Sequence, residues 1–139
     1  MVRFNMFRIN TEQFAILENQ LPTGEVTLNS ELLFKHSVEG KSIATEISFS
    51  FATAQSKFIV LKVSCEFSIH PDDWEIFKEG NTIVIKKNLL EYFVVQTIGT
   101  ARGILHCKTE GTPFNIFVLP PINVTELVTE DMIIQVPNL

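Results

Sequence analysis

Residues 59–69 read IVLKVSCEFSI, in which every odd position is apolar. Most of the even positions are polar, namely Lys62, Ser64, Glu66 and Ser68. A period of two is typical of a β-strand that has one buried and one hydrated face, as in antiparallel sheets. This stretch therefore predicts a half-buried strand with an antiparallel neighbour.

The same period recurs twice upstream. Apolar side chains favour the even positions of residues 26–38 and the odd positions of residues 43–51. Glu39-Gly40-Lys41 between them has the length of a hairpin turn, and residues 52–57 form the next connection. A less regular strand is expected around residues 4–9, extending toward Leu17. His36 lies on the apolar side of its strand, where we expect a partly buried histidine rather than a metal ligand.

The pattern changes in the second half of the chain. From Asn88 to about Lys108, apolar residues recur at steps of three and four, which predicts a long helix with one buried face. Asn88 is the expected N-cap, and Gly111 lies just beyond the expected end. Residues 82–86 are expected to form a short edge strand. Strands followed by a long helix predict an α+β fold, and 139 residues fit a single domain.

Two glycines lie four residues apart inside the predicted helix, at Gly99 and Gly103. Each costs about 0.5–1 kcal/mol relative to alanine in a helix interior. Close approach of another backbone, from the same domain or from a neighbouring subunit, would offset that cost. A locally frayed or kinked helix is the alternative interpretation.

Composition limits the classes of partner. The net charge of −5 disfavours nucleic acid, whose recognition requires clustered Lys and Arg. The mean hydropathy of +0.21 is high, yet no apolar run approaches the length of a membrane span. An oligomeric interface or an apolar binding surface would account for the apolar excess. We expect no secretory signal, and we expect Cys65 and Cys107 to be reduced thiols of a cytoplasmic protein.

Motifs for catalysis and for cofactor or metal binding are scarce. His36, His70 and His106 share no spacing that suits a metal pair, and the chain has no CxxC, glycine-rich phosphate loop or GxSxG. His106 and Cys107 are adjacent on the predicted helix and would diverge by about 100°. Asp72-Asp73 is interpreted as a solvated turn after His70-Pro71. We therefore expect no enzyme, no cofactor and no metal site.

Phenylalanine is the distinctive residue, with twelve copies against one Tyr and one Trp. Most of them are expected in the core. Some of them, with nearby leucines and Trp74, lie near predicted loops and sheet edges. Phenylalanine offers apolar area without a polar group that needs a specific partner, so such a surface could accept extended polypeptide. The candidate polypeptide-binding surface comprises Phe14, Leu17, Leu21, Trp74, Phe77, Phe114 and Phe117.

The segment after the predicted helix combines apolar residues with a double proline. Pro120 and Pro121 stop any strand or helix that would run through them. We expect residues 109–113 to turn the chain and residues 114–119 to run extended. The prolines would then fix a bend before a last short element, with Thr125 as a possible cap.

Residues 100–123, TARGILHCKTEGTPFNIFVLPPIN, resemble the SecB family of export chaperones. The family has a long helix carrying Ala-Arg, a turn with Gly-Thr-Pro and a closing Leu-x-Pro-Val/Ile-Asn, here residues 119–123. Weaker matches are Arg8-Ile9, Glu25-Val26-x-Leu28 and Cys65-Glu66. The sequence departs from the family in the loop at residues 21–24, which carries no aromatic residue.

This resemblance implies a four-stranded antiparallel sheet with the long helix and a short C-terminal helix packed on one side. It also implies a homotetramer built as a dimer of dimers, with Gly99, Arg102 and Gly103 on the candidate oligomer helix. The implied function is that of an ATP-independent holdase, which binds unfolded or nascent polypeptides in apolar surface grooves for protein export. Docking of a translocation motor on an acidic outer sheet face is also implied, although Lys35, Lys41 and Lys62 interrupt that face.

Two other functions remain open. The chain could be a dedicated protein–protein interaction module or a client-specific chaperone, for example of an antitoxin. It could also be a small-molecule binder or an enzyme that uses a pocket between helix and sheet.

Overall fold

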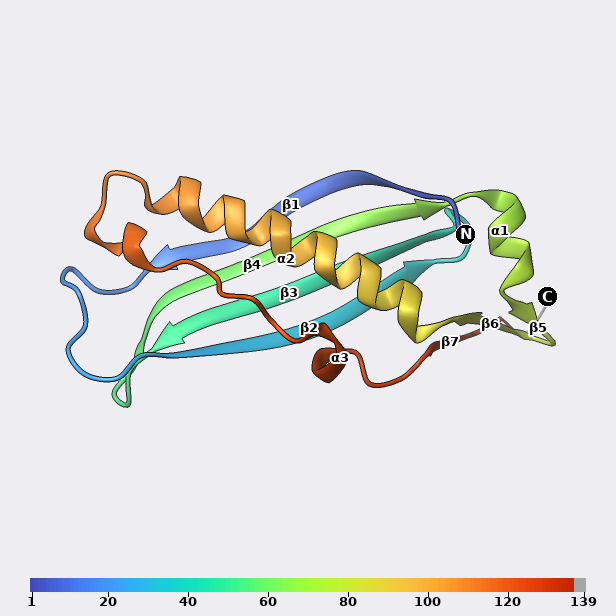
Figure 1. The fold of residues 1–139 in the computed structure, drawn as a ribbon. Helices are drawn as coiled ribbons and strands as arrows, with labels where there is room; N and C mark the ends of the chain where they lie inside the picture. The colour runs from blue at the N-terminus through green and yellow to red at the C-terminus, as the bar shows by residue number, and fades with distance from the viewer. Residues whose placement is uncertain (137–139) are drawn as a thin grey trace.

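A four-stranded antiparallel sheet forms the body of the computed structural model, which describes residues 1–136 (Figure 1). The strands lie in the order β1-β4-β3-β2. Their bounds are β1 (Phe4–Ile16), β2 (Thr27–Ser37), β3 (Ser42–Ala52) and β4 (Lys57–Ile69). The predicted α+β fold and the four-stranded sheet are confirmed.

The period of two in the sequence determines which face of the sheet is buried. Ile47 pairs with Val63 on one side and with Leu32 on the other, so the three side chains share a face. The odd positions of β4 from Ile59 to Ile69 are all buried on this face. The polar positions of the strands therefore form the opposite, outer face.

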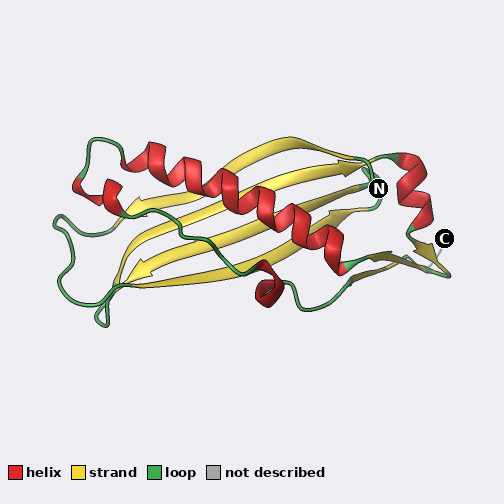
Figure 2. Cartoon of the chain, viewed as in Figure 1, coloured by secondary structure: helices red, strands yellow, loops and turns green. Residues whose placement is uncertain are grey.

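The long helix α2 (Lys87–Thr109) lies across the apolar face (Figure 2). Phe93 is fully buried and stacks on Phe67 of β4, with ring centroids 4.3 Å apart. Burial of a side chain of this size contributes about 1.5–3 kcal/mol relative to leaving it exposed. The three-and-four spacing of apolar residues thus reflects packing of the helix against the sheet.

The N-terminal cap of α2 differs from the prediction. The helix begins at Lys87, one residue before Asn88, whose side-chain oxygen accepts a hydrogen bond from the Leu89 amide at 3.0 Å. The Lys87 amide instead donates to Asp131 Oδ1 at 2.7 Å. A residue 44 positions away therefore supplies the acceptor that Asn88 was expected to supply.

A second, smaller sheet combines two strands that lie between β4 and α2 in the sequence with one strand that follows α2. The helix α1 (Pro71–Ile76) leads into β5 (Lys78–Glu79) and β6 (Thr82–Ile85). The strand β7 (Met132–Gln135) then returns from the C-terminal part of the chain, and the order is β5-β6-β7. The predicted edge strand at residues 82–86 is therefore the central strand of this sheet, because β7 covers its other side.

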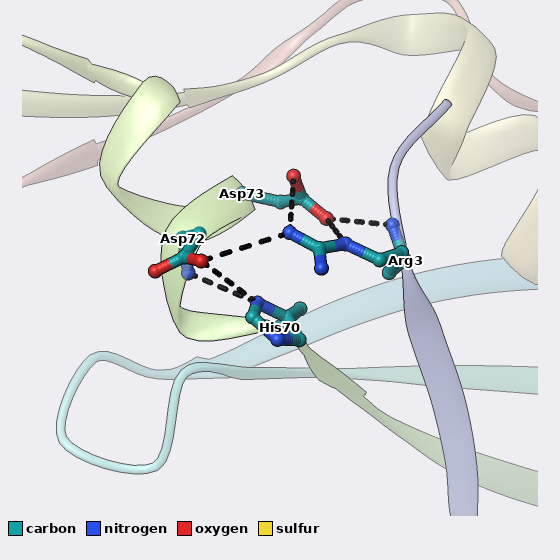
Figure 3. A network of polar contacts seen from close by, with 4 residues as sticks. All are labelled: Arg3, His70, Asp72 and Asp73. Carbon is teal, nitrogen blue, oxygen red and sulfur yellow. Dashed lines mark hydrogen bonds and ion pairs between the residues drawn. The ribbon is translucent and has the colours of Figure 1, made fainter.

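Four side chains tie the start of β1 to α1 (Figure 3). Asp73 Oδ2 accepts hydrogen bonds from the Arg3 backbone amide at 2.8 Å and from Arg3 Nε at 3.0 Å. The hydrogen bond from the Arg3 side chain lowers the pKa of Asp73 below its ordinary value. His70 Nδ1 accepts from the Asp72 amide at 3.2 Å. Asp72 and Asp73 thus begin a helix, and the prediction of a solvated turn is wrong.

The segment after α2 is only partly extended. Residues Pro113–Ile116 form the 3-10 helix η1, because the Thr112 hydroxyl accepts from the Phe114 amide and Pro113 favours the first helical position. The predicted extended conformation is therefore wrong for residues 114–116. The short helix α3 (Val124–Leu127) follows, and its cap is Asn123 rather than Thr125.

The two edge strands of the large sheet differ in regularity. β1 shifts register twice, between Met6 and Arg8 and between Thr11 and Gln13. β2 pairs with β3 from Thr27 to Ser37 without any shift. His36 on β2 is exposed rather than partly buried, since an edge strand has a neighbour on one side only.

Candidate polypeptide-binding surface

The seven predicted surface residues lie at opposite ends of the large sheet. Five of them belong to the end where β1 leads into the connection to β2 and where η1 lies (Figure 1). Trp74 and Phe77 belong to the other end, in and just after α1. The structure therefore does not gather the seven residues into one site.

A cluster of four phenylalanines lies at the first end. Phe117 approaches Phe58 with ring centroids 5.0 Å apart and Phe51 at 5.5 Å, and Phe114 lies 6.2 Å from Phe58. Phe114 is only 3% exposed, so it belongs to the core in this structure. Phe117 is half-buried and links the cluster to the surface.

Exposed apolar side chains flank this cluster. Leu17 is 53% exposed, and its amide donates a hydrogen bond to the Phe58 carbonyl. Leu21 and Phe58 line a cavity of about 670 Å³ beside the β1–β2 connection. Ile116 and Val118, on either side of Phe117 in the sequence, are 69% and 54% exposed. We call this area the crossover surface, and it comprises Phe14, Leu17, Leu21, Ile116, Phe117 and Val118.

Two of these residues, Ile116 and Val118, were missed in the sequence. The available signal was the stretch FNIFVLPP, in which Ile116 and Val118 are apolar like Phe114, Phe117 and Leu119. Exposure in a loop has no periodicity, so only the structure separates Phe114, which is inside, from its neighbours.

The second group offers less surface than expected. Trp74 is 1% exposed and is therefore a core residue. Phe77 is half-buried and lines a cavity of about 400 Å³ together with Leu89 and Tyr92 of α2 and with Val2 and Phe4. This cavity is mainly apolar, but it lies at the opposite end of the sheet from the crossover surface.

The glycines of α2 lie on an exposed stripe. A Cβ atom at Gly99 or Gly103 would meet nothing within 4 Å, so packing within this chain does not require glycine there. α2 runs unbroken over both positions, so a frayed helix does not account for them. Tyr92 and Val95 precede them on the same stripe and are 50% and 52% exposed.

Beside this stripe, β1 carries two further exposed apolar side chains. Phe7 is 46% exposed and Ile9 is 51% exposed. Phe4 of the same strand touches Tyr92 of α2, with ring centroids 6.1 Å apart. We call Phe7, Ile9, Tyr92 and Val95, with Gly99 and Gly103, the flank surface.

Arg102 points to the chain's own backbone. Its Nε donates to the Leu119 carbonyl at 2.7 Å, and its Nη2 donates to the Pro120 carbonyl at 2.9 Å. The double proline is thereby tied to the middle of α2.

Reactive side chains are dispersed in the described part of the chain. Within residues 1–136, no three His, Cys, Asp or Glu side chains gather closely enough to hold a metal ion. Cys65 is buried, and desolvation raises the pKa of its thiol, whereas Cys107 is exposed. None of the helices within the same range has both the length and the apolar character needed to cross a membrane.

Comparison with solved structures gives a match over most of the chain. No protein-family model matches the chain, and no curated protein shows significant similarity to it. The SecB-like chaperone Rv1957 of Mycobacterium tuberculosis, solved in complex with a ChAD peptide from the Rv1956 HigA1 antitoxin, superposes with a TM-score of 0.58. The two sequences are 14% identical, and the match covers 87% of this chain and 91% of that chain.

A protein of unknown function from Streptococcus agalactiae matches with a TM-score of 0.36 and 11% identity, over 79% of this chain and 90% of that chain. The comparison with Rv1957 shows that the chain has a SecB-like fold.

Proposed function

We propose that this protein is an ATP-independent holdase that binds unfolded or nascent polypeptides at the crossover surface. One observation carries the proposal: exposed Leu17, Leu21, Ile116 and Val118 flank a phenylalanine cluster at one end of a SecB-like sheet. Burial of apolar area contributes about 25 cal/mol per Å² without directional preference. Such a surface can hold many client sequences.

The free edge of β2 supports binding of extended chain. Its outer side has no strand neighbour in the described sheet, and its register is regular over its whole length. Backbone hydrogen bonds to such an edge are independent of client side chains. The crossover surface would supply apolar contacts, and β2 would supply backbone pairing.

The solved relative also supports a polypeptide client. Rv1957 is a SecB-like chaperone that was solved with a peptide bound. A peptide from an antitoxin favours a second candidate function, in which this protein serves a single client or acts as a dedicated interaction module. Purification from its native cell separates the two: one stoichiometric partner supports the second function, and many unrelated chains support the holdase.

A homotetramer, built as a dimer of dimers, is part of the proposal. The flank surface exposes apolar side chains on both α2 and β1, and Gly99 and Gly103 leave the helix open to a neighbour. Exposed apolar patches of this kind mark interfaces. Light scattering after size exclusion should give four times the mass of one chain.

Delivery to a translocation motor stays a prediction from the resemblance, and a cytoplasmic location stays a prediction from the cysteine pattern and the N-terminal sequence. The outer sheet face carries ion pairs between Arg8 and Glu66, at 3.4 Å, and between Lys35 and Glu46, at 3.7 Å. The positive charges of Arg8 and Lys35 partly offset the carboxylates of this face, which disfavours docking of a motor there.

The central test is suppression of aggregation. The protein should keep a chemically denatured client in solution at a near-stoichiometric ratio without nucleotide. Ile116→Ser combined with Val118→Ser should weaken suppression because it removes apolar area from the crossover surface. Ile76→Ser combined with Ile133→Ser is the matched control, since these side chains are 75% and 61% exposed and lie in α1 and β7, outside the crossover surface and β2. Absence of suppression by the unmodified protein, or equal losses in the two variants, would contradict the proposal.

A further inference from the structure

The segment from residue 118 to residue 122 has no regular secondary structure. The Phe117 amide donates to Phe114, and the next backbone hydrogen bond belongs to Glu126. Pro120 and Pro121 have no amide hydrogen to donate. Within residues 1–136, the only hydrogen bonds to the backbone of this segment come from Arg102.

The guanidinium group suits this role. Nε and Nη2 are donors in a fixed planar arrangement, and they meet the carbonyls of two successive residues at 2.7 and 2.9 Å. Hydrogen bonds from a charged donor are about twice as strong as neutral ones. Two such bonds fix the direction of the backbone as well as its position.

This direction determines what the segment presents to solvent. Leu119 is 1% exposed and points into the core, whereas Val118 is 54% exposed. Phe117, one residue earlier, packs on Phe51 and Phe58. A rotation of the backbone at Leu119 would therefore move Phe117 and Val118, two of the six residues of the crossover surface.

We propose that Arg102 is a positioning residue for client binding. Its hydrogen bonds to the carbonyls of Leu119 and Pro120 keep Phe117 and Val118 in place as one wall of the client site. The inference rests on the proposed holdase function. Buried Phe114 and Leu119 keep the segment on the core when Arg102 is replaced, so Arg102 fixes the orientation of the backbone and is not required for folding.

Three variants test this role. Arg102→Met removes both donors and keeps an unbranched side chain that suits a helix. Arg102→Lys keeps the positive charge, but its single ammonium group cannot reproduce the planar pair of hydrogen bonds to the Leu119 and Pro120 carbonyls. Lys108→Met is the matched control, since it removes one positive charge from an exposed position of the same helix.

Mobility of the wall is measured separately from client binding. A nitroxide label is placed at residue 118, as Val118→Cys in a Cys107→Ser background, with a reference label at Leu33. R102M should increase mobility at residue 118 and leave the reference unchanged. Unlabelled variants are then titrated with reduced, carboxymethylated α-lactalbumin as the unfolded client. R102M should raise Kd about tenfold, R102K by a smaller factor, and K108M should match the unmodified protein.

The outcomes separate this inference from the proposed function. Unchanged mobility at residue 118 in R102M overturns the inference even when the client binds normally. Increased mobility with unchanged Kd also overturns it and leaves the holdase function intact. If the unmodified protein binds no client, the holdase function fails and the positioning role fails with it. R102K carries the test alone if R102M does not fold, with intermediate mobility and a rise in Kd as the expected result.

Discussion

Asp131→Ala removes the acceptor that holds the N-terminus of α2. In the native structure, Asp131 Oδ1 lies 2.7 Å from the Lys87 amide nitrogen, and Oδ2 lies 3.8 Å from Lys86 Nζ. The substitution leaves that amide without a side-chain acceptor. It also releases the segment just before β7 from the helix.

The expected loss of stability follows from these two contacts. Removal of a side-chain acceptor at a helix N-terminus costs about 0.5–2 kcal/mol. The ion pair adds little, because the Lys86 side chain is 64% exposed and the Asp131 side chain 38% exposed. The free energy of unfolding should therefore fall by about 1–2 kcal/mol. For a chain of this size the unfolding midpoint should fall by about 3–8 °C.

Thermal and urea unfolding of three variants provide the assay. Asp131→Asn keeps a side-chain oxygen that can accept from Lys87, so it should lose much less stability than D131A. Glu130→Ala is the control for removal of an exposed neighbouring carboxylate. Hydrogen exchange of the β7 amides should accelerate in D131A alone. Equal destabilisation by D131A and D131N, or by D131A and E130A, would refute the reasoning.

Three further predictions concern the N-terminal anchor, the core and the assembly. The interaction of Asp73 with Arg3 lowers the pKa of Asp73, so its stabilising effect should be complete above the unfolded-state pKa of about 3.9 and be lost as pH falls through the folded-state pKa. Urea unfolding of the native protein and Asp73→Asn should therefore differ at pH 7 and converge at low pH. Phe93→Ala should lower the free energy of unfolding by about 3–5 kcal/mol because the ring is fully buried on Phe67, whereas exposed Gln96→Ala should change it little in the same assay. Val95→Asp should reduce the mass measured by light scattering, because a charge would enter the flank surface; an unchanged mass would remove Val95 from the interface.

The large sheet could be predicted because its strands are long and half-buried. Each strand from residue 26 to residue 69 carries enough alternations to identify its inner face, and register follows from that face. The long helix was predictable for the same reason. The strands and the helix each have one face in solvent and one face in the core, so apolar residues recur in their sequences at a regular spacing.

The small sheet and the cap of α2 depend on contacts between distant parts of the chain. β7 has four residues, too few to establish a period, and it is ordered by pairing with β6. Asp131 lies 44 residues after Lys87 in the sequence. It can accept a hydrogen bond from the Lys87 amide only because the folded chain brings the two residues together. Asn88, the local alternative, was therefore preferred in the sequence-based prediction.

The sequence indicated some of the residues that contribute to the candidate site, but it did not indicate how they are arranged in space. Phe117 and Leu17 were expected to contribute, and the structure places both beside Phe58. Trp74 was expected on the same surface and is in the core at the other end. Aromatic residues in short, irregular segments carry no period, so the sequence does not show which way they point.

The unequal edges of the large sheet have a consequence for the behaviour of concentrated solutions. The two register shifts in β1 disturb its outer hydrogen-bonding pattern, and such bulges hinder pairing with another molecule. β2 has no such protection, so molecules that meet at this edge can begin a cross-β stack. Fibril growth should thus start at β2, and an unfolded client that occupies this edge should lengthen the lag phase of the protein's own fibrillation.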